Sequence, residues 1–346
     1  MRRFVSLKGH FAVSRVLSLT AGALAVCVSM TTPSVAGTVR FGSGTNTFQM
    51  EFVTIGNPGN SPDDTGTPNL AGAVAYEYGI GKFEVSEDMI NKFNALQSLQ
   101  ISMGSFGANK PATFVSRNEA ARFVNWLNTS TGGVAAYNFT TSGVNDSIAL
   151  WQAGDAGFDP LNPYRNSLAK YVLPSYNEWY KAAYYDPDSS TYYNFPNGSD
   201  SAPLAVTSGV ADNTAVYSQS LAQGPADVNQ AGGLSPYRVM GLGGNVFEWE
   251  ESSADLSNGS DSSSRGLRGG AWNSNSNNLS SSSRLTSFPA WYETENVGFR
   301  VVTLSLSDPP AVPEPSMMLI GTLFGLGGLI AKARSKSKGQ GSLLGS

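Results

Sequence analysis

Apolar side chains recur at intervals of three and four residues in three segments, which predicts three amphipathic helices. They are Ser86 to Gln97, Ser116 to Leu127 and Ser175 to Tyr184. Each begins with a serine, and in the second and third a glutamate follows three residues later, which is the capping-box pattern. Elsewhere short apolar runs separate long loops rich in Gly, Ser, Asn and Asp, which indicates short strands. Few helices among many loops predict an α+β fold.

The first 36 residues depart from this pattern and read as a signal peptide. A basic start is followed by the apolar stretch Val16 to Met30 and by small residues, Ser34-Val35-Ala36, that suit cleavage before Gly37. The alternative is a membrane anchor, but the apolar run is short for a span of about 20 residues. Export of the chain is therefore expected, with a domain from residue 37 to residue 308.

Residues 309–346 carry a second apolar segment with distinctive flanks. Pro313-Glu314-Pro315 precedes the apolar stretch Met317 to Ala331, and a basic cluster begins at Lys332. This order resembles the PEP-CTERM sorting signal of Gram-negative bacteria. The resemblance implies an inner-membrane intermediate, processing by an exosortase, and release to the cell surface or the extracellular space. A plain C-terminal anchor is the alternative.

The composition of the exported part excludes several kinds of catalysis, metal binding and partner. The only histidine, His10, and the only cysteine, Cys27, both lie in the predicted signal peptide. Their loss removes thiolate nucleophiles and the commonest zinc, copper and iron ligands. The chain between the two end segments keeps 14 of the 22 basic and 25 of the 26 acidic residues. Such an acidic domain is a poor partner for nucleic acid.

Five blocks of sequence lie in order between Phe48 and Val302. They are Tyr78 to Ser86; Pro111 to Ser116 with Asn125-Trp126-Leu127; Tyr171 to Ser175 with Glu178-Trp179; Gly243 to Trp249; and Leu267 to Trp272, closed by Gly298-Phe299-Arg300. Together they resemble the formylglycine-generating enzyme, or sulfatase-modifying factor, family. The resemblance implies a variant of the C-type lectin-like fold, irregular and loop-rich. We expect Trp179, Trp249 and Trp272 to anchor its core.

The same resemblance bears on catalysis. Active members of the family bind copper through two cysteines that follow the Arg-Gly-Gly-x-Trp block, and they oxidise a substrate cysteine to formylglycine. The matching positions are Ser274 and Leu279. A serine hydroxyl is a poor copper(I) ligand and leucine cannot ligate, so no copper is expected. The family's iron-dependent branch needs histidines, which the exported part lacks.

Calcium needs neither missing residue, because it binds carboxylate and carbonyl oxygens. The family's calcium turn maps onto Gly244, Val246 and Glu248, although Gly241 replaces a ligand side chain upstream. A second family site maps onto Asn213-Thr214, with Asp227 as a further candidate. In the alternative interpretation, Glu248 caps a buried loop through backbone hydrogen bonds.

Two classes of function remain from the sequence. The first is a non-catalytic domain at the cell surface or in the extracellular matrix, whose amide-rich segment Asn273 to Ser283 binds polysaccharide or surface proteins. That segment could also be only a solvated loop. The second class is an enzyme of different chemistry that reuses the family pocket with carboxylates such as Glu248 and Glu250.

Overall fold

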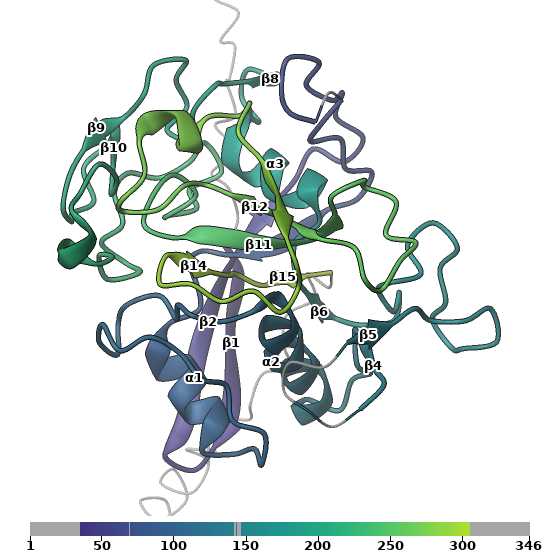
Figure 1. Cartoon of the computed structure of the whole chain (residues 1–346). Helices are drawn as coiled ribbons and strands as arrows, with labels where there is room; N and C mark the ends of the chain where they lie inside the picture. The colour runs from purple at the N-terminus through teal and green to yellow at the C-terminus, as the bar shows by residue number, and fades with distance from the viewer. Residues whose placement is uncertain (1–34, 69, 142, 144–146, 305–346) are drawn as a thin grey trace, which may run out of the picture. The chain divides into compact units, whose positions relative to one another are not determined.

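The structure is a computed structural model that describes residues 35–68, 70–141, 143 and 147–304 (Figure 1). The predicted signal peptide, except for Val35 and Ala36, and the predicted sorting segment lie outside the described residues. No helix within the described part of the chain has the length and apolarity needed to cross a membrane. The first strand begins at Val35, two residues before the domain start predicted from the sequence.

Two sheets carry most of the strand pairing. The first has five strands in the order β1-β2-β3-β15-β6, and all of its neighbours are antiparallel. The second has four strands in the order β13-β12-β11-β14, of which only β11 and β14 are parallel. The strands of the first sheet are β1 (Val35–Ser43), β2 (Asn46–Ile55), β3 (Tyr78–Gly81), β6 (Tyr171–Val172) and β15 (Val302–Thr303). Those of the second are β11 (Phe247–Ser253), β12 (Arg265–Arg268), β13 (Leu285–Phe288) and β14 (Val297–Gly298).

Three further pairs have strands of only two residues each. They are β4 (Asn138–Phe139) with β5 (Ile148–Ala149), β7 (Tyr185–Asp186) with β8 (Thr191–Tyr192), and β9 (Leu204–Ala205) with β10 (Thr214–Ala215). Loops join all of these elements. The described chain is therefore mixed and rich in short strands, as the sequence predicts.

All three predicted helices are confirmed. They are α1 (Glu87–Asn94), α2 (Arg117–Ser130) and α3 (Tyr176–Tyr184), with Ser86, Ser116 and Ser175 as their N-caps. Both predicted capping boxes form. Helix α1 ends three residues before its predicted end, whereas α2 runs three residues beyond. The extension has a tertiary cause, because Asn128 in the last turn of α2 bonds both the amide nitrogen and the carbonyl oxygen of Tyr171.

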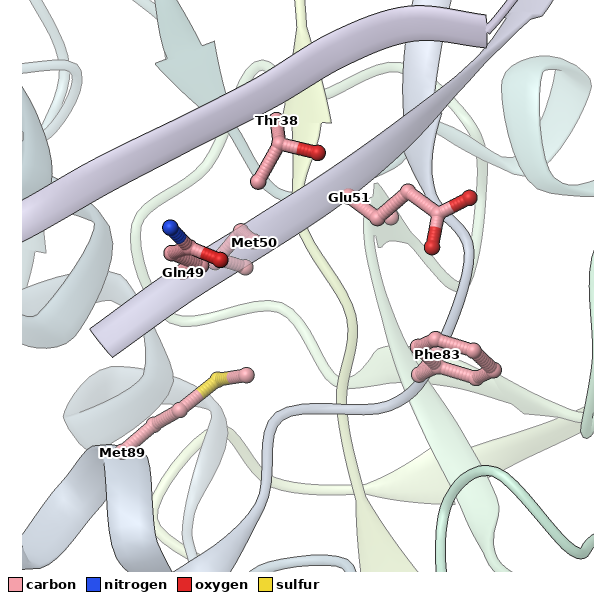
Figure 2. A pocket seen from close by; sticks show the side chains of 7 residues that line it. Thr38, Gln49, Met50, Glu51, Phe83 and Met89 are labelled. Carbon is pink, nitrogen blue, oxygen red and sulfur yellow. The ribbon is translucent and has the colours of Figure 1, made fainter.

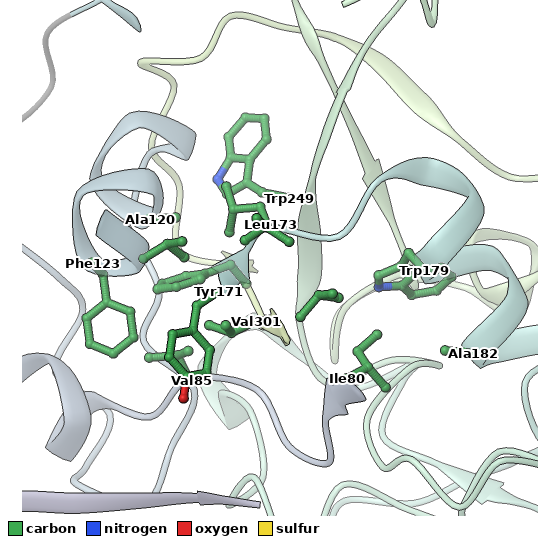
Figure 3. Packing of buried hydrophobic residues seen from close by; sticks show 14 of the residues in the cluster. Ile80, Val85, Ala120, Phe123, Tyr171, Leu173, Trp179, Ala182, Trp249 and Val301 are labelled. Carbon is green, nitrogen blue, oxygen red and sulfur yellow. The ribbon is translucent and has the colours of Figure 1, made fainter. Parts of the chain in front are cut away.

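The core lies between these elements and is anchored by tryptophans. Trp179, Trp249 and Trp272 are fully buried, which confirms the prediction. Figure 3 shows Trp179 of α3 and Trp249 of β11 in the same apolar cluster as Phe123 of α2. The indole nitrogen of Trp249 donates to the carbonyl oxygen of Val115 (2.9 Å), so its polar atom is satisfied. Large rings with a satisfied polar atom can hold together loops that have few strands of their own.

Candidate functional site

Strand β11 carries three glutamates whose side chains are completely buried: Glu248, Glu250 and Glu251. Each is paired with arginine. Glu248 binds Arg300, Glu250 binds Arg268 and Arg284, and Glu251 binds Arg165. Burying a carboxylate is costly unless a cation and hydrogen bonds accompany it. These contacts join β11 to the last of the five sequence blocks, which contains both Arg268 and Arg300.

The Glu248–Arg300 pair lies at the centre of the candidate site. Both nitrogens of one edge of the Arg300 guanidinium reach Glu248, at 2.5 and 2.6 Å, and the indole nitrogen of Trp179 donates to it at 2.7 Å. Arg300 also donates to the carbonyl oxygens of Gly81 and Met240. Burial by itself would lower the pKa of Arg300, but Glu248 holds it above its usual value. The carboxylate thus accepts three hydrogen bonds, two of them from a paired guanidinium.

This geometry bears on both functions predicted for Glu248. A calcium ion bound by its carboxylate would have to displace Arg300, so the side chain does not fit a calcium ligand. Glu250 is equally occupied by Arg268 and Arg284, at 2.8 Å each. Neither acid is free to serve as a general acid or base, which removes the reason for treating the two as a catalytic carboxylate pair.

Glu84, which the sequence did not single out, lies against the same turn. Its Oε1 accepts a hydrogen bond from Asn245 (3.0 Å), and its Oε2 is buried without a partner among the described residues. A Cβ atom on Gly241 would come within 2.6 Å of this carboxylate, and Gly241 has a positive φ of 75°. The Glu84 side chain therefore occupies the space that a larger residue at position 241 would need. Burial raises the pKa of Glu84 to about 8, against the opposing effect of Arg300.

The free energy of unfolding is expected to fall as the pH rises from 4.5 to about 8, because Glu84 holds its proton more tightly in the folded chain. A raised pKa in the folded state gives stability that is present at low pH and lost on ionisation. Burial raises the pKa of Glu119 to about 7, which adds a dependence of the same sign. Urea unfolding at pH 5 and pH 8 should show a smaller difference for Glu84→Gln than for the wild type. An unchanged difference would mean that another group is responsible.

The positions of the family's cysteine pair have structural roles. The Ser274 hydroxyl accepts a hydrogen bond from the Ala271 amide (3.0 Å) and closes the turn after Trp272. Leu279 is fully buried, and it packs so close to Gly270 that a Cβ atom at position 270 would lie only 2.8 Å from the Leu279 Cδ1 atom. An apolar side chain thus fills the space at this position. These residues do not fit a copper ion.

The other predicted metal positions are scattered among backbone contacts. Asn213 accepts from the Leu204 amide through its carbonyl oxygen, and Thr214 donates to the carbonyl oxygen of Ala211. Asp227 pairs with Lys110 at 3.1 Å. Val216, two residues after Thr214, forms an isolated backbone bridge with Gly244, which brings the chain near the second predicted position next to the predicted calcium turn. No group of three or more acidic, histidine or cysteine side chains in the described ranges could hold a metal ion.

The amide-rich segment Asn273 to Ser283 forms a turn and a short 3-10 helix, Ser276–Leu279, that Asn275 caps. Asn275 and Asn277 are exposed. Asn273 is tied to the neighbouring loop because its Oδ1 accepts from Asn296 (3.2 Å). The segment therefore presents its asparagines from a folded turn rather than from a strand.

One exposed aromatic side chain contacts the buried Trp272, and two other exposed apolar side chains lie in nearby loops. Phe106 packs edge-on against it with a centroid distance of 5.5 Å, and the Trp272 indole donates to the carbonyl oxygen of Leu221. Phe106 and Phe114 are each 38% exposed and Leu221 is 56% exposed. Phe114 also has a φ of 56°, a rare conformation for a bulky residue. With Asn273 and Asn296, these three side chains form what we name the Trp272 surface. The sequence reveals neither its rings nor Glu84, because the loops that assemble them are far apart along the chain.

Comparison with known proteins gives the fold and the family. Treponema denticola variable protein 1 has a similar structure, with a TM-score of 0.53, 18% identity, and coverage of 77% of this chain and 98% of that chain. CarF gives a TM-score of 0.50 and 20% identity, with coverage of 73% and 98%. At such identities the likeness concerns the fold alone. No curated protein matches the sequence. The model of the sulfatase-modifying factor enzyme 1-like domain matches residues 35–304, and the chain therefore belongs to the formylglycine-generating-enzyme (sulfatase-modifying factor) family.

Proposed function

We propose that this protein is an exported, non-catalytic member of its family, with the C-type lectin-like variant of the fold. It acts at the cell surface or in the extracellular matrix. The observation that carries the proposal is the buried side chain of Leu279, which lies where the family's copper enzymes need a thiolate. Arginine pairing of Glu248 and Glu250 supports it further, since the enzyme alternative depended on those acids.

The Trp272 surface is the candidate binding face. Aromatic rings can stack on the faces of sugars, and asparagine side chains can exchange hydrogen bonds with hydroxyl groups. Phe114, an exposed ring on a residue with a positive φ, adds a feature that is often found at functional surfaces. We therefore propose polysaccharide of the extracellular matrix as the partner, with surface proteins as the second candidate.

Sedimentation with matrix polysaccharide from the producing cells tests this function. The purified protein is expected to sediment with the polysaccharide, and the variant Phe106→Ser, Asn273→Ala, Asn296→Ala of the Trp272 surface should bind less. The triple variant Asn275→Ala, Asn277→Ala, Asn278→Ala tests the adjoining amide-rich segment separately. Leu161→Ser is the matched control, because Leu161 is 89% exposed in a different loop. A wild-type protein that stays in the supernatant would contradict the binding role. Variants that sediment like the wild type would exclude this face.

Export and processing rest on the two ends of the chain. The PEP-CTERM proposal predicts a cell-surface or released product that lacks Met317 to Ser346. A Glu314→Ala, Pro315→Ala variant should remain in the inner membrane, because an exosortase would no longer process it. If the variant gave the same product at the same location, the plain anchor would be the better explanation.

Calcium remains a prediction for the carbonyl oxygens of Gly244 and Val246. A ligand that binds only the folded state raises its stability by mass action. A lower melting temperature in excess chelator would support calcium at this turn. An unchanged temperature would mean that the turn folds without metal.

A further inference from the structure

A groove runs over one face of the β1–β2 hairpin and is lined on its other side by residues of α1 and nearby loops. It consists of two cavities of about 230 and 420 Å³, which share the lining residues Gln49 and Met89. Figure 2 shows the smaller one, with Gln49 and Glu51 from β2 on one side and Phe83 and Met89 on the other. We name the two cavities together the hairpin groove. The larger is within the size range of small-molecule sites.

One wall of the groove is a polar stripe that the strand register builds. Arg40 is opposite Gln49 and Thr38 is opposite Glu51, so these four side chains share one face of the antiparallel pair. Thr47 continues the stripe and accepts a hydrogen bond from Arg40 at 3.2 Å. Thr38, Arg40 and Gln49 are exposed, which leaves this wall open to solvent.

The opposite wall is fixed by several contacts. Both carboxylate oxygens of Glu87 accept backbone amides, from Phe106 at 2.6 Å and Gly107 at 3.0 Å. The Asn109 carbonyl oxygen accepts from Val228, and both residues line the larger cavity. A groove whose walls are held before binding loses less entropy when a ligand enters.

The acidic side chains at the groove are paired with lysines, and one positively charged side chain has no acidic partner among the described residues. Glu51 is paired with Lys82 and Asp88 with Lys92, each at 2.7 Å. Among the described residues, Arg40 has a hydroxyl partner but no carboxylate partner. Such a guanidinium in an otherwise balanced groove favours a ligand with carboxylate groups, which it can bind through two parallel hydrogen bonds.

From these observations we infer that the hairpin groove binds an oligosaccharide that carries carboxylate groups, of the hexuronate class. The carboxylate pairs with Arg40, and the hydroxyl groups bond to the Thr47, Gln49 and Asn109 side chains. Phe83 and Met89 contact the apolar face of a sugar ring. The inference rests on the proposed binding function and adds a second binding site with its own set of lining residues.

Titration of the purified protein with oligogalacturonate tests the inference. The control ligand is the same oligosaccharide after reduction of its carboxyl groups to alcohols. Heat of binding is followed together with methyl signals of labelled methionines, because Met89 lines the groove and Met240 does not. The wild type should bind the acidic chain, with a shift of Met89 and none of Met240. Arg40→Gln should weaken binding by about tenfold or more, the effect of losing a charge-assisted contact with the carboxylate. Arg238→Gln, which removes an exposed arginine elsewhere, should bind like the wild type.

Three results would overturn the inference. They are equal binding by Arg40→Gln, equal binding of the reduced oligosaccharide, and no binding of either oligosaccharide. Each concerns the groove alone, because sedimentation with the whole matrix tests the proposed function independently. Matrix sedimentation without oligogalacturonate binding would leave the Trp272 surface as the site.

Discussion

Replacing Arg300 by leucine is expected to lower the free energy of unfolding by about 3–5 kcal/mol, the usual effect of removing one partner of a buried ion pair. The variant leaves the fully buried Glu248 carboxylate with the Trp179 indole as its only hydrogen-bond donor among the described residues. The substitution also removes the positive charge that lies near Glu84. The carbonyl oxygens of Gly81 and Met240 each lose the hydrogen bond that Arg300 donates to them. Urea unfolding followed by tryptophan fluorescence measures the effect.

The matched control is Lys92→Met, which breaks a half-exposed i,i+4 pair with Asp88. Such pairs contribute about 0.3–0.5 kcal/mol. The double variant Glu248→Leu, Arg300→Leu should recover part of the loss, because it leaves no unpaired buried charge. A loss below about 1 kcal/mol in Arg300→Leu would show that Glu248 has another cation, and a bound metal ion would be the first candidate.

Replacing Leu279 by alanine is expected to cost about 2–5 kcal/mol, because it leaves a cavity beside Gly270 and Gly243. Leu221→Ala is the control, since Leu221 is 56% exposed and its contact with Trp272 is made by its backbone oxygen. Exposed substitutions of this kind usually change stability by less than about 0.5 kcal/mol. If both variants were equally stable, Leu279 would not be filling the family pocket, and the structural basis of the proposed function would fail.

The sequence predicts local features of the fold better than the long-range pairings. The pairs Ser116–Glu119 and Ser175–Glu178 predict both capping boxes correctly. Each serine is only three positions from its glutamate, so the whole motif lies within one helical turn and can be recognised in the sequence. The pairing of β15 with β3 joins Val302 to Ile80, and strands of two residues carry no periodicity to reveal it. The end of α2 depends on Asn128 and Tyr171, which are 43 positions apart.

The candidate site also has some features that the sequence predicts and others that depend on the fold. The identities of Ser274 and Leu279 are enough to exclude a copper ligand pair. The role of Glu248 depends on the fold, because its partner Arg300 is 52 positions away in a separate block. The hairpin groove depends on the fold as well, since β1, β2, α1 and the loop after residue 100 contribute to its walls. A sequence pattern could indicate the strands and the helix but not the groove between the hairpin and α1.

The most direct test of the central claim is oxygen consumption by the purified protein with copper(I) and a cysteine peptide of the sulfatase type. Heat-denatured protein provides the blank for thiol oxidation by free copper, and a hydrazide probe detects the aldehyde of formylglycine. The proposed non-catalytic role predicts oxygen uptake equal to the blank and no aldehyde, because Ser274 and Leu279 supply no soft ligand. Copper-dependent uptake above the blank, with aldehyde formed in the peptide, would contradict it.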